Sequence, residues 1–358
     1  MPSENNDLSE LSGIGFSEEE LENIINQNKL KIKIVGVGGA GSNTVNKMME
    51  KNLENEVSDV ELIAVNTDAV HLSGINVQKR YVIGKALSKG RGAGADPLKG
   101  EQAARESVNV IDKFLENSKI TVIVAGMGGG TGSGAAPFIA SRAKKLGSMT
   151  IGICSWPLRG EGKIREENAK LGLRNFMRAA DSVILFHNNK IVELVPEERI
   201  DAALAFADSI MMQAIVGLIE TVTKTTQVNT EMSDLEKVMS KKGLGTFGVG
   251  VSDSPPGQRV EEAFEQAINS PFSSISMQDA KAMLISITGG EDLRMTEQTD
   301  AMELARRKIG RDAIIIPRLG IDKQLNGKIK ILLFATGIPS EFDDASKDDS
   351  TFSENTIE

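Results

Sequence analysis

Three glycine-rich runs contain the residues best suited to chemistry. The densest, Gly126–Gly134, reads GMGGGTGSG, so that a threonine and a serine stand among the glycines. Unobstructed backbone N–H groups beside hydroxyl groups form a nest for an anion. We expect this run to leave a strand and to open a helix at Ala135, with Pro137 in its first turn. Because we see no packing demand for so many glycines, each of which costs conformational entropy, the run predicts a phosphate site.

Two other runs have related spacing. Gly36–Gly41 reads G-x-G-x-x-G between an apolar strand and a helix, which lets a helix N-terminus approach a phosphate. For this run alone, a tight strand–helix turn without a ligand is the alternative. Gly90–Pro97 also precedes a helix. Three such loops suggest a triphosphate or a dinucleotide. The chain has no G-x-x-x-x-G-K-[ST] motif, so we expect backbone dipoles and a metal ion to stabilise the phosphates.

Strands that alternate with helices must hold these loops. We predict strands over Lys31–Val37, Val60–Val65, Ile120–Ala125, Thr150–Ser155 and Val183–Phe186. We predict helices over Ser42–Lys51, Asp96–Asn117, Gly134–Leu146 and Arg165–Arg178. Such alternation indicates an α/β fold with a doubly wound, parallel sheet.

A long helix is predicted from Pro196 to Thr223. It is apolar on most faces, as buried helices are, and we interpret it as a spine between two domains. Beyond it, strands are predicted over Phe247–Val251, Ala282–Ile287, Ala313–Pro317 and Lys328–Thr336, and helices over Arg259–Asn269 and Thr296–Ile309. These elements predict a smaller α+β domain with a mostly mixed sheet.

The predicted organisation has five parts. An acidic extension, 1–30, contains a short helix that begins at the capping box of Ser17 and Glu20. A nucleotide-binding domain follows over 31–195, the central helix over 196–223 and the smaller domain over 224–338. An acidic tail over 339–358 is predicted to be disordered.

Composition excludes several classes of protein. The net charge of −9 over 358 residues is concentrated at the ends, since residues 1–30 and 338–358 each hold seven acids and one lysine. The middle of the chain is therefore slightly basic, which gives no support to nucleic-acid binding. Aromatic residues make up 4 %, too few for rows of stacking aromatics. No apolar window is long enough for a membrane span, and the acidic start does not resemble a signal peptide. We therefore expect a cytoplasmic protein.

The chain has one cysteine and two histidines. Cys154 lies in an apolar run and is expected to be a buried thiol. His71 and His187 are far apart in sequence, and no Cys/His constellation is present. We therefore predict no protein-ligated metal.

The order of the motifs resembles that of the tubulin/FtsZ family of GTPases, on the FtsZ side and nearest to its archaeal members. The resemblance covers about residues 31–338. It rests on Gly36–Asn43, Asn66–Ala69, Gly90–Pro97, Gly128–Gly134, Pro157, Glu161, Gly162, Arg165, Asn188–Lys190, Ile287–Leu293 and Lys328–Gly337. It implies that residues 31–195 bind GTP or GDP and that 224–338 form a C-terminal activation or polymerisation domain.

The resemblance also implies roles for individual residues. The phosphates would be met by Gly38, Gly39, Ala40 and Asn43 and by Gly128, Gly129, Gly130, Thr131, Gly132, Ser133 and Gly134. Further nucleotide loops would contribute Asn66, Asp68, Ala69, Gly92, Ala93, Gly94 and Pro157, and Glu161 and Arg165 would contact ribose and phosphate. Mg²⁺ would be held through the phosphates and water.

The base would be read by Asn188 and Asp208. A carboxylate can accept from both guanine N1–H and the exocyclic amine, although Asp208 alone would pass for a solvated helix acid. Leu204 stands where the family usually has an aromatic residue, and it covers a base without stacking as well.

By the same resemblance, hydrolysis depends on a second subunit. Asn229, Glu231 and Asp234 would enter the nucleotide site of the next subunit and position the attacking water. Glu231 departs from the family's aspartate by one methylene, and a displaced carboxylate can lower the rate. An ordinary helix N-terminus, where acids favour the dipole, is the alternative.

The partners implied are further copies of the chain in head-to-tail protofilaments and membrane-anchoring or division adaptor proteins at the mid-cell division site. Direct membrane insertion and nucleic-acid binding are not expected. Two alternatives stay open at this point. A nicotinamide-dependent dehydrogenase would explain the run Gly36–Gly41, but neither the second glycine run nor the acidic residues near Asn229. A filament scaffold or regulator with weak hydrolysis would explain Glu231.

Overall fold

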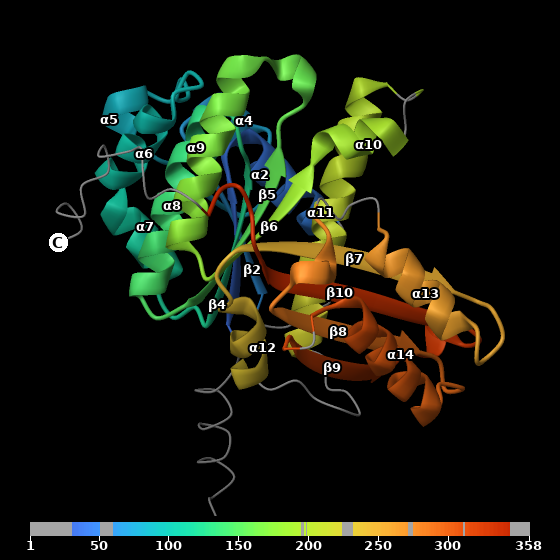
Figure 1. Cartoon of the computed structure of the whole chain (residues 1–358). Helices are drawn as coiled ribbons and strands as arrows, with labels where there is room; N and C mark the ends of the chain where they lie inside the picture. Colours follow the sequence, from blue (N-terminus) through green and yellow to red (C-terminus); the bar gives the residue numbers. More distant parts are fainter. Residues whose placement is uncertain are drawn as a thin grey trace, which may run out of the picture.

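A computed structural model describes residues 31–50, 60–194, 197, 199–223, 232–270, 275–310 and 312–343. Its centre is a ten-stranded sheet in the order β3-β2-β1-β4-β5-β6-β7-β10-β8-β9. Figure 1 shows this sheet running from the helix-covered first domain into a smaller second domain.

The first domain contains a parallel sheet with helices on both faces, as predicted, but with six strands where five were expected. They are β1 (Ile32–Val37), β2 (Val60–Asn66), β3 (Lys79–Val82), β4 (Ile120–Gly126), β5 (Met149–Trp156) and β6 (Ser182–His187). Alternate residues of one strand enter different cores: Ile34 packs with the central helix, whereas Val35 packs with the helices of the opposite face. Both faces are therefore buried, as in parallel sheets generally. The sequence had not indicated the edge strand β3.

Two predicted helices begin earlier than expected. The helices α2 (Gly38–Glu50) and α8 (Gly130–Lys145) start within their glycine runs, four residues before the predicted starts. Pro137 consequently lies inside α8, and its expected place in the first turn was wrong. The first turns of both helices are thus made of the glycines themselves, whose N–H groups are the unpaired donors of a helix start.

The helix predicted over Asp96–Asn117 is in fact two helices. They are α6 (Pro97–Glu106) and α7 (Val108–Leu115), separated by Ser107. The Ser107 hydroxyl accepts from Gly84 N at 2.9 Å, so this break fastens the preceding loop. The small helices α4 (Ala69–Ser73) and α5 (Lys85–Ser88) were not predicted, whereas α9 (Lys163–Ala179) lies where expected.

The central helix α11 (Ile200–Thr223) starts four residues later than predicted, after the unpredicted α10 (Asn188–Leu194). Its buried residues, among them Ile215 and Leu218, share one core with β1 and with Phe334 of the second domain. This packing confirms the interpretation of α11 as a spine. Within the described residues, no helix is both long and apolar enough to cross a bilayer.

The second domain has a mixed sheet, as predicted. Its strands are β7 (Leu244–Ser252), β8 (Ala282–Gly289), β9 (Ile314–Ile321) and β10 (Ile329–Ile338), and its helices are α12 (Met232–Met239), α13 (Arg259–Ile268) and α14 (Met295–Lys308). Strand β10 is antiparallel to β7 and β8, and β8 is parallel to β9. A short parallel pairing of β6 with β7 joins both domains into one sheet.

The folded part extends past the predicted boundary at residue 338. Phe342 packs against Trp156 with ring centroids 5.6 Å apart, and Ser340 N donates to Asp343 Oδ2 at 2.7 Å. Residues 339–343 are therefore ordered, whereas the prediction placed them in a disordered tail. The remaining tail and the helix predicted after Ser17 lie outside the described residues.

Candidate functional site

Most of the predicted site residues follow the carboxyl ends of parallel strands. The glycine runs follow β1 and β4, Asn66 ends β2, Pro157 follows β5 and Asn188 follows β6. All of these ends lie at one edge of the sheet, at the top of Figure 1. Ligands of open α/β sheets bind at this edge, so topology brings the separate motifs together.

The first glycine run meets the second directly. Gly38 has φ +74°, a conformation that favours glycine, and a Cβ there would lie 3.1 Å from Gly132 N. Gly39 is exposed and has ordinary backbone angles, with His71 as its nearest neighbour. Asn43 is exposed one turn along α2. The N-termini of α2 and α8 thus point into a shared space, where their dipoles favour an anion.

The expectation that packing does not need these glycines was wrong. A Cβ on Gly132 would lie 2.2 Å from Gly126 O, and one on Gly134 would lie 2.0 Å from Pro97 O. Gly130 is pressed against Asp96 in the same way. The alternating glycines therefore let α8 approach β4 and α6. Gly129 differs, because a Cβ there would meet nothing within 4 Å. Packing therefore does not explain why a glycine stands at position 129 of this run.

The hydroxyl groups of the run also bond within the protein. Thr131 Oγ1 lies 2.6 Å from Thr67 Oγ1, and Ser133 Oγ accepts from Gly128 N at 2.8 Å. Both side chains are buried. Their role in this structure is to shape the loop, which leaves backbone N–H groups other than that of Gly128 as the donors for an anion.

The loops after β2 and β3 form one unit. Asp68 caps α4 by accepting from Val70 N at 2.9 Å and His71 N at 3.0 Å. Ala69 N donates to Gly90 O at 3.0 Å, and Gly92 N donates to Thr67 O at 3.1 Å. Asn66 is buried. In the same loop, Ala93 is buried against Gly130, whereas Gly94 is exposed at φ +63°.

Beyond β5 and β6, polar residues line a hollow of about 360 Å³. Asn189 fixes the backbone that lines this hollow through two hydrogen bonds. Its Oδ1 accepts from Arg159 N at 2.8 Å, and its Nδ2 donates to Pro157 O at 3.3 Å. Beside it, Glu161 forms an ion pair with Arg165. Asn188 Oδ1 is buried and has no hydrogen-bond partner in the described part of the chain. A buried acceptor without a donor is costly, so it fits a missing ligand.

Asp208 lies across from α2. Lys47 Nζ is 2.9 Å from Asp208 Oδ2. Burial raises the pKa of Asp208, and the hydrogen bonds and charge from Lys47, with a hydrogen bond from Thr44, oppose that rise. The backbone of Leu204 lies one turn earlier in α11. The sequence analysis missed Lys47, although its position four residues after Asn43 on one helix face could have indicated it.

Asp234 is the one predicted catalytic residue that the structure describes, and it is not brought to this edge within one chain. Asp234 lies in α12, which Figure 1 places at the opposite end of the first domain from the glycine runs. It accepts from Lys237 Nζ at 2.8 Å. Asn229 and Glu231 lie outside the described residues.

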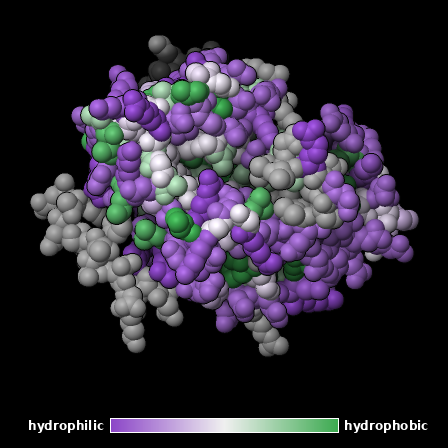
Figure 2. Space-filling model, turned by 90° about the horizontal axis from the view of Figure 1, so that it is seen from above, coloured by the Kyte–Doolittle hydropathy of each residue, from purple (hydrophilic) through white to green (hydrophobic). Residues whose placement is uncertain are grey.

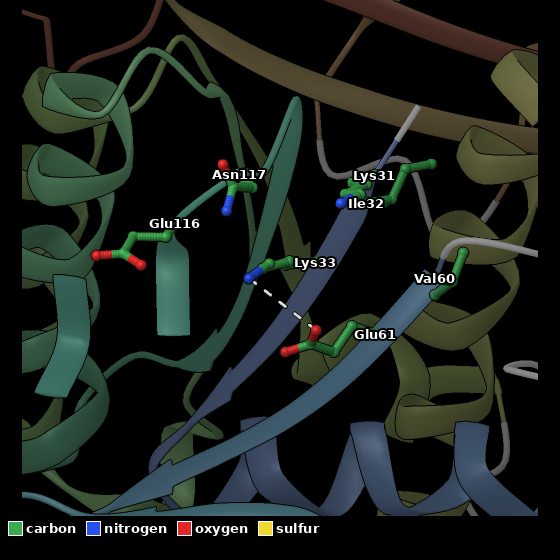
Figure 3. A pocket seen from close by; sticks show the side chains of 7 residues that line it. All are labelled: Lys31, Ile32, Lys33, Val60, Glu61, Glu116 and Asn117. Carbon is green, nitrogen blue, oxygen red and sulfur yellow. Dashed lines mark ion pairs between the residues drawn. The ribbon is translucent and has the colours of Figure 1, made fainter. Parts of the chain in front are cut away.

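A second hollow, of about 490 Å³, lies at the amino edge of the same sheet (Figure 3). Lys33 Nζ donates to Phe114 O at 2.7 Å and is 4.0 Å from Glu61, which also pairs with Lys79 at 2.9 Å. Burial lowers the pKa of Lys33. These contacts satisfy a buried lysine far from the glycine runs, so we assign them to stability rather than to the site.

No cluster of three or more His, Cys, Asp or Glu side chains that could hold a metal exists within the described ranges.

Comparisons with known proteins identify the family and the fold. Residues 31–196 match the GTPase domain of the tubulin/FtsZ family, and residues 243–339 match the C-terminal domain of the FtsZ family. The chain is 40 % identical to cell division protein FtsZ 1 of Pyrococcus abyssi over 95 % of this chain and 88 % of that protein. The corresponding protein of Methanocaldococcus jannaschii is 36 % identical over 95 % and 92 %. The solved FtsZ dimer of M. jannaschii superposes with a TM-score of 0.79 at 35 % identity, covering 90 % of this chain and 93 % of that one.

Proposed function

The chain belongs to the tubulin/FtsZ family, and we propose that it hydrolyses GTP in an assembled filament, where each subunit completes the active site of its neighbour. One observation carries this proposal: the glycine runs lie at the upper end of the first domain, whereas α12, which contains Asp234, lies at its lower end (Figure 1). A carboxylate at one end can reach phosphates at the other only in a second copy stacked head to tail.

The edge with the glycine runs supports GTP or GDP as the bound nucleotide. The first turns of α2 and α8 offer backbone N–H groups to the phosphates, with Gly129 open to their approach. The unpaired Asn188 Oδ1 and the carboxylate of Asp208 are acceptors for the donor edge of guanine. Mg²⁺ would be held by the phosphates. The dehydrogenase alternative is set aside because residues 31–196 match a GTPase domain.

Hydrolysis in this proposal consists of positioning and electrostatic stabilisation. Asp234 lies in the first turn of α12, and with Glu231 it would orient water against the γ-phosphate of the neighbouring subunit. Glu231 is one methylene longer than the family's aspartate, so turnover is expected to be slower than with aspartate there. A filament scaffold with weak hydrolysis is the second candidate, and Glu231 is the residue that favours it.

The surface around the glycine runs supports contact with another subunit. Val70, Leu98 and Ile164 are each the second residue of a helix that begins at this edge, and they are 80 %, 56 % and 73 % exposed. Figure 2 views this edge from above, with hydrophobic atoms in green among hydrophilic ones. Covering these side chains with the lower end of another copy would remove apolar surface from water.

The relatives are named cell division proteins, and we infer that this chain acts in cell division as a cytoplasmic filament at the mid-cell division site. Attachment to the membrane would then depend on a separate anchor or adaptor protein.

Turnover measured against protein concentration tests the proposal. A site shared between subunits requires GTP hydrolysis per chain to rise from near zero above a threshold concentration, together with filaments in electron micrographs. Hydrolysis per chain that is independent of concentration would refute the shared site. Binding of GTP without turnover at any concentration would favour the scaffold.

A further inference from the structure

Lys47 connects the first nucleotide helix to the central helix. It lies one turn after Asn43 on α2, and its ammonium group donates to Asp208 Oδ2 at 2.9 Å and to Ala205 O at 3.2 Å, both on α11. The side chains of Lys47 and Asp208 are 30 % and 16 % exposed, respectively. This contact is therefore a partly desolvated ion pair between two helices, which fixes the position of one carboxylate oxygen.

The charge of Lys47 opposes the effect of burial on Asp208. Desolvation favours the neutral acid and raises the pKa of Asp208. Lys47 lowers it through a hydrogen bond and through its charge, and Thr44 of the same helix adds a hydrogen bond. On α10, which also packs against α11, Lys190 and Glu193 are not among the causes of this pKa shift. Among the described residues, Lys47 is thus the charged group that opposes the rise in the pKa of Asp208.

The ionisation state of such a carboxyl group determines which purine it can read. Guanine presents two donors side by side, N1–H and the N2 amine, and an ionised carboxylate accepts both. Adenine presents a donor at N6 beside an acceptor at N1. A protonated carboxyl group matches adenine, because it donates through its O–H and accepts through its other oxygen. Neutralising Asp208 would therefore weaken the binding of guanine and remove the mismatch with adenine.

We propose that Lys47 is a positioning residue for base selection: its ion pair with Asp208 keeps the carboxylate charged and oriented, so that the site accepts guanine and rejects adenine. Each carboxylate oxygen can accept more than one hydrogen bond, so Lys47 and the base can share the group. The inference rests on the proposed function, which places the base at Asp208.

The test measures the affinities of GTP and ATP by calorimetry between pH 6 and 8, on the full-length protein. In Lys47→Met the affinity for GTP should fall at least about tenfold, as expected for the loss of a charged hydrogen bond, while that for ATP stays or rises. The loss should grow as the pH falls, because without Lys47 the pKa of Asp208 is higher and protonation begins earlier. Lys47→Arg should restore both selectivity and the flat pH profile.

Two further variants separate base selection from general damage. Lys144→Met removes a lysine that is paired with Asp181 at 2.7 Å away from this site, and it should leave the GTP/ATP ratio unchanged. Asp208→Asn should lose GTP affinity independently of pH. Adding Lys47→Met to Asp208→Asn should cause no further loss, since the two residues act through one interaction. If Lys47→Met alone folds poorly, Lys47→Gln takes its place in the same comparison of single and double variants.

Equal losses for GTP and ATP in Lys47→Met, or a pH profile like that of the unaltered protein, would show that Lys47 is merely structural and would overturn the inference alone. If the unaltered protein itself does not prefer GTP over ATP, the inference and the proposed function fail together.

Discussion

The hydroxyl oxygens of Thr67 and Thr131 lie 2.6 Å apart in a buried contact that ties the loop after β2 to the first turn of α8. One hydrogen bond between side chains thus links two of the proposed nucleotide loops directly. Gly92 N, which donates to Thr67 O at 3.1 Å, fastens the third loop to the same point.

Thr131→Val should therefore lower stability as well as nucleotide affinity. The valine fills the same volume but leaves the buried Thr67 hydroxyl without this partner, which costs roughly 1–3 kcal/mol. Chemical denaturation with and without Thr67→Val measures this cost. The double variant should be less destabilised than the sum of the single variants. Additive losses would show that the contact contributes nothing.

Gly129→Val provides a cleaner test of the phosphate site. A Cβ at Gly129 meets no protein atom within 4 Å, so the thermal midpoint should not change. A ligand that lies against this backbone would be pushed away, and we expect GTP affinity to fall at least about tenfold, or about 1.4 kcal/mol. Gly310→Val, at a second open glycine, is the matched control. Unchanged GTP binding in Gly129→Val would place the nucleotide elsewhere.

The sequence was sufficient for every strand of the sheet except the edge strand β3, and for the loops at the carboxyl edge, because these depend on local patterns. Apolar runs of strand length and glycine runs before helices are visible residue by residue. The role of glycine in packing was not visible, since the collision of a Cβ on Gly134 with Pro97 O depends on a helix contact distant in sequence. The break at Ser107 depends likewise on a bond to the distant Gly84. Lys47 could be placed on α2, but its pairing with Asp208 required the helix packing.

The boundary of the acidic tail can be tested through the chain's single tryptophan. Removing residues 344–358 should leave turnover within about twofold, because no described contact is lost. Removing residues 340–358 also takes Phe342 away from Trp156. We then expect a red shift of the tryptophan emission and a lower thermal midpoint, because a buried aromatic contact is lost. An identical emission spectrum for the two truncations would mean that Phe342 does not cover Trp156 in solution.

His187 should make stability depend on pH. Its ring lies 5.5 Å from that of Trp156, and burial, with Lys190, lowers its pKa below the usual value. The unfolded chain therefore binds a proton more readily, so this contribution to stability is complete above the unfolded pKa of about 6.5 and is lost as the pH falls towards the folded pKa. Urea unfolding between pH 7.5 and 5 should show a steeper decline for the unaltered protein than for His187→Gln. Parallel declines would contradict this assignment.

The last prediction concerns the division of one active site between two chains. Asp234→Ala should bind GTP normally, because α12 lies away from the nucleotide edge of its own chain (Figure 1). It should still assemble, because only one side chain is shortened. Its turnover should nevertheless be low, since a group that acts mainly in the transition state can be removed without weakening ground-state binding. Glu303→Ala, which removes an exposed acid from α14, is the control and should hydrolyse GTP at the normal rate. Glu231→Asp should keep turnover equal or raise it.

Mixing two inactive variants then distinguishes a shared site from a self-contained one. Asp234→Ala retains the nucleotide edge but lacks the acid. Gly129→Val retains the acid but, at GTP concentrations too low to occupy its weakened site, holds little nucleotide. In a mixed filament, Asp234 of a Gly129→Val subunit can face GTP held by an Asp234→Ala subunit. If incorporation is random and equal, about one contact in four joins the two intact halves, so the mixture should regain part of the activity that each variant lacks alone. Sedimentation must show that both chains enter the same filaments. A co-assembled mixture as inactive as its components would mean that Asp234 does not act on the nucleotide of a neighbour.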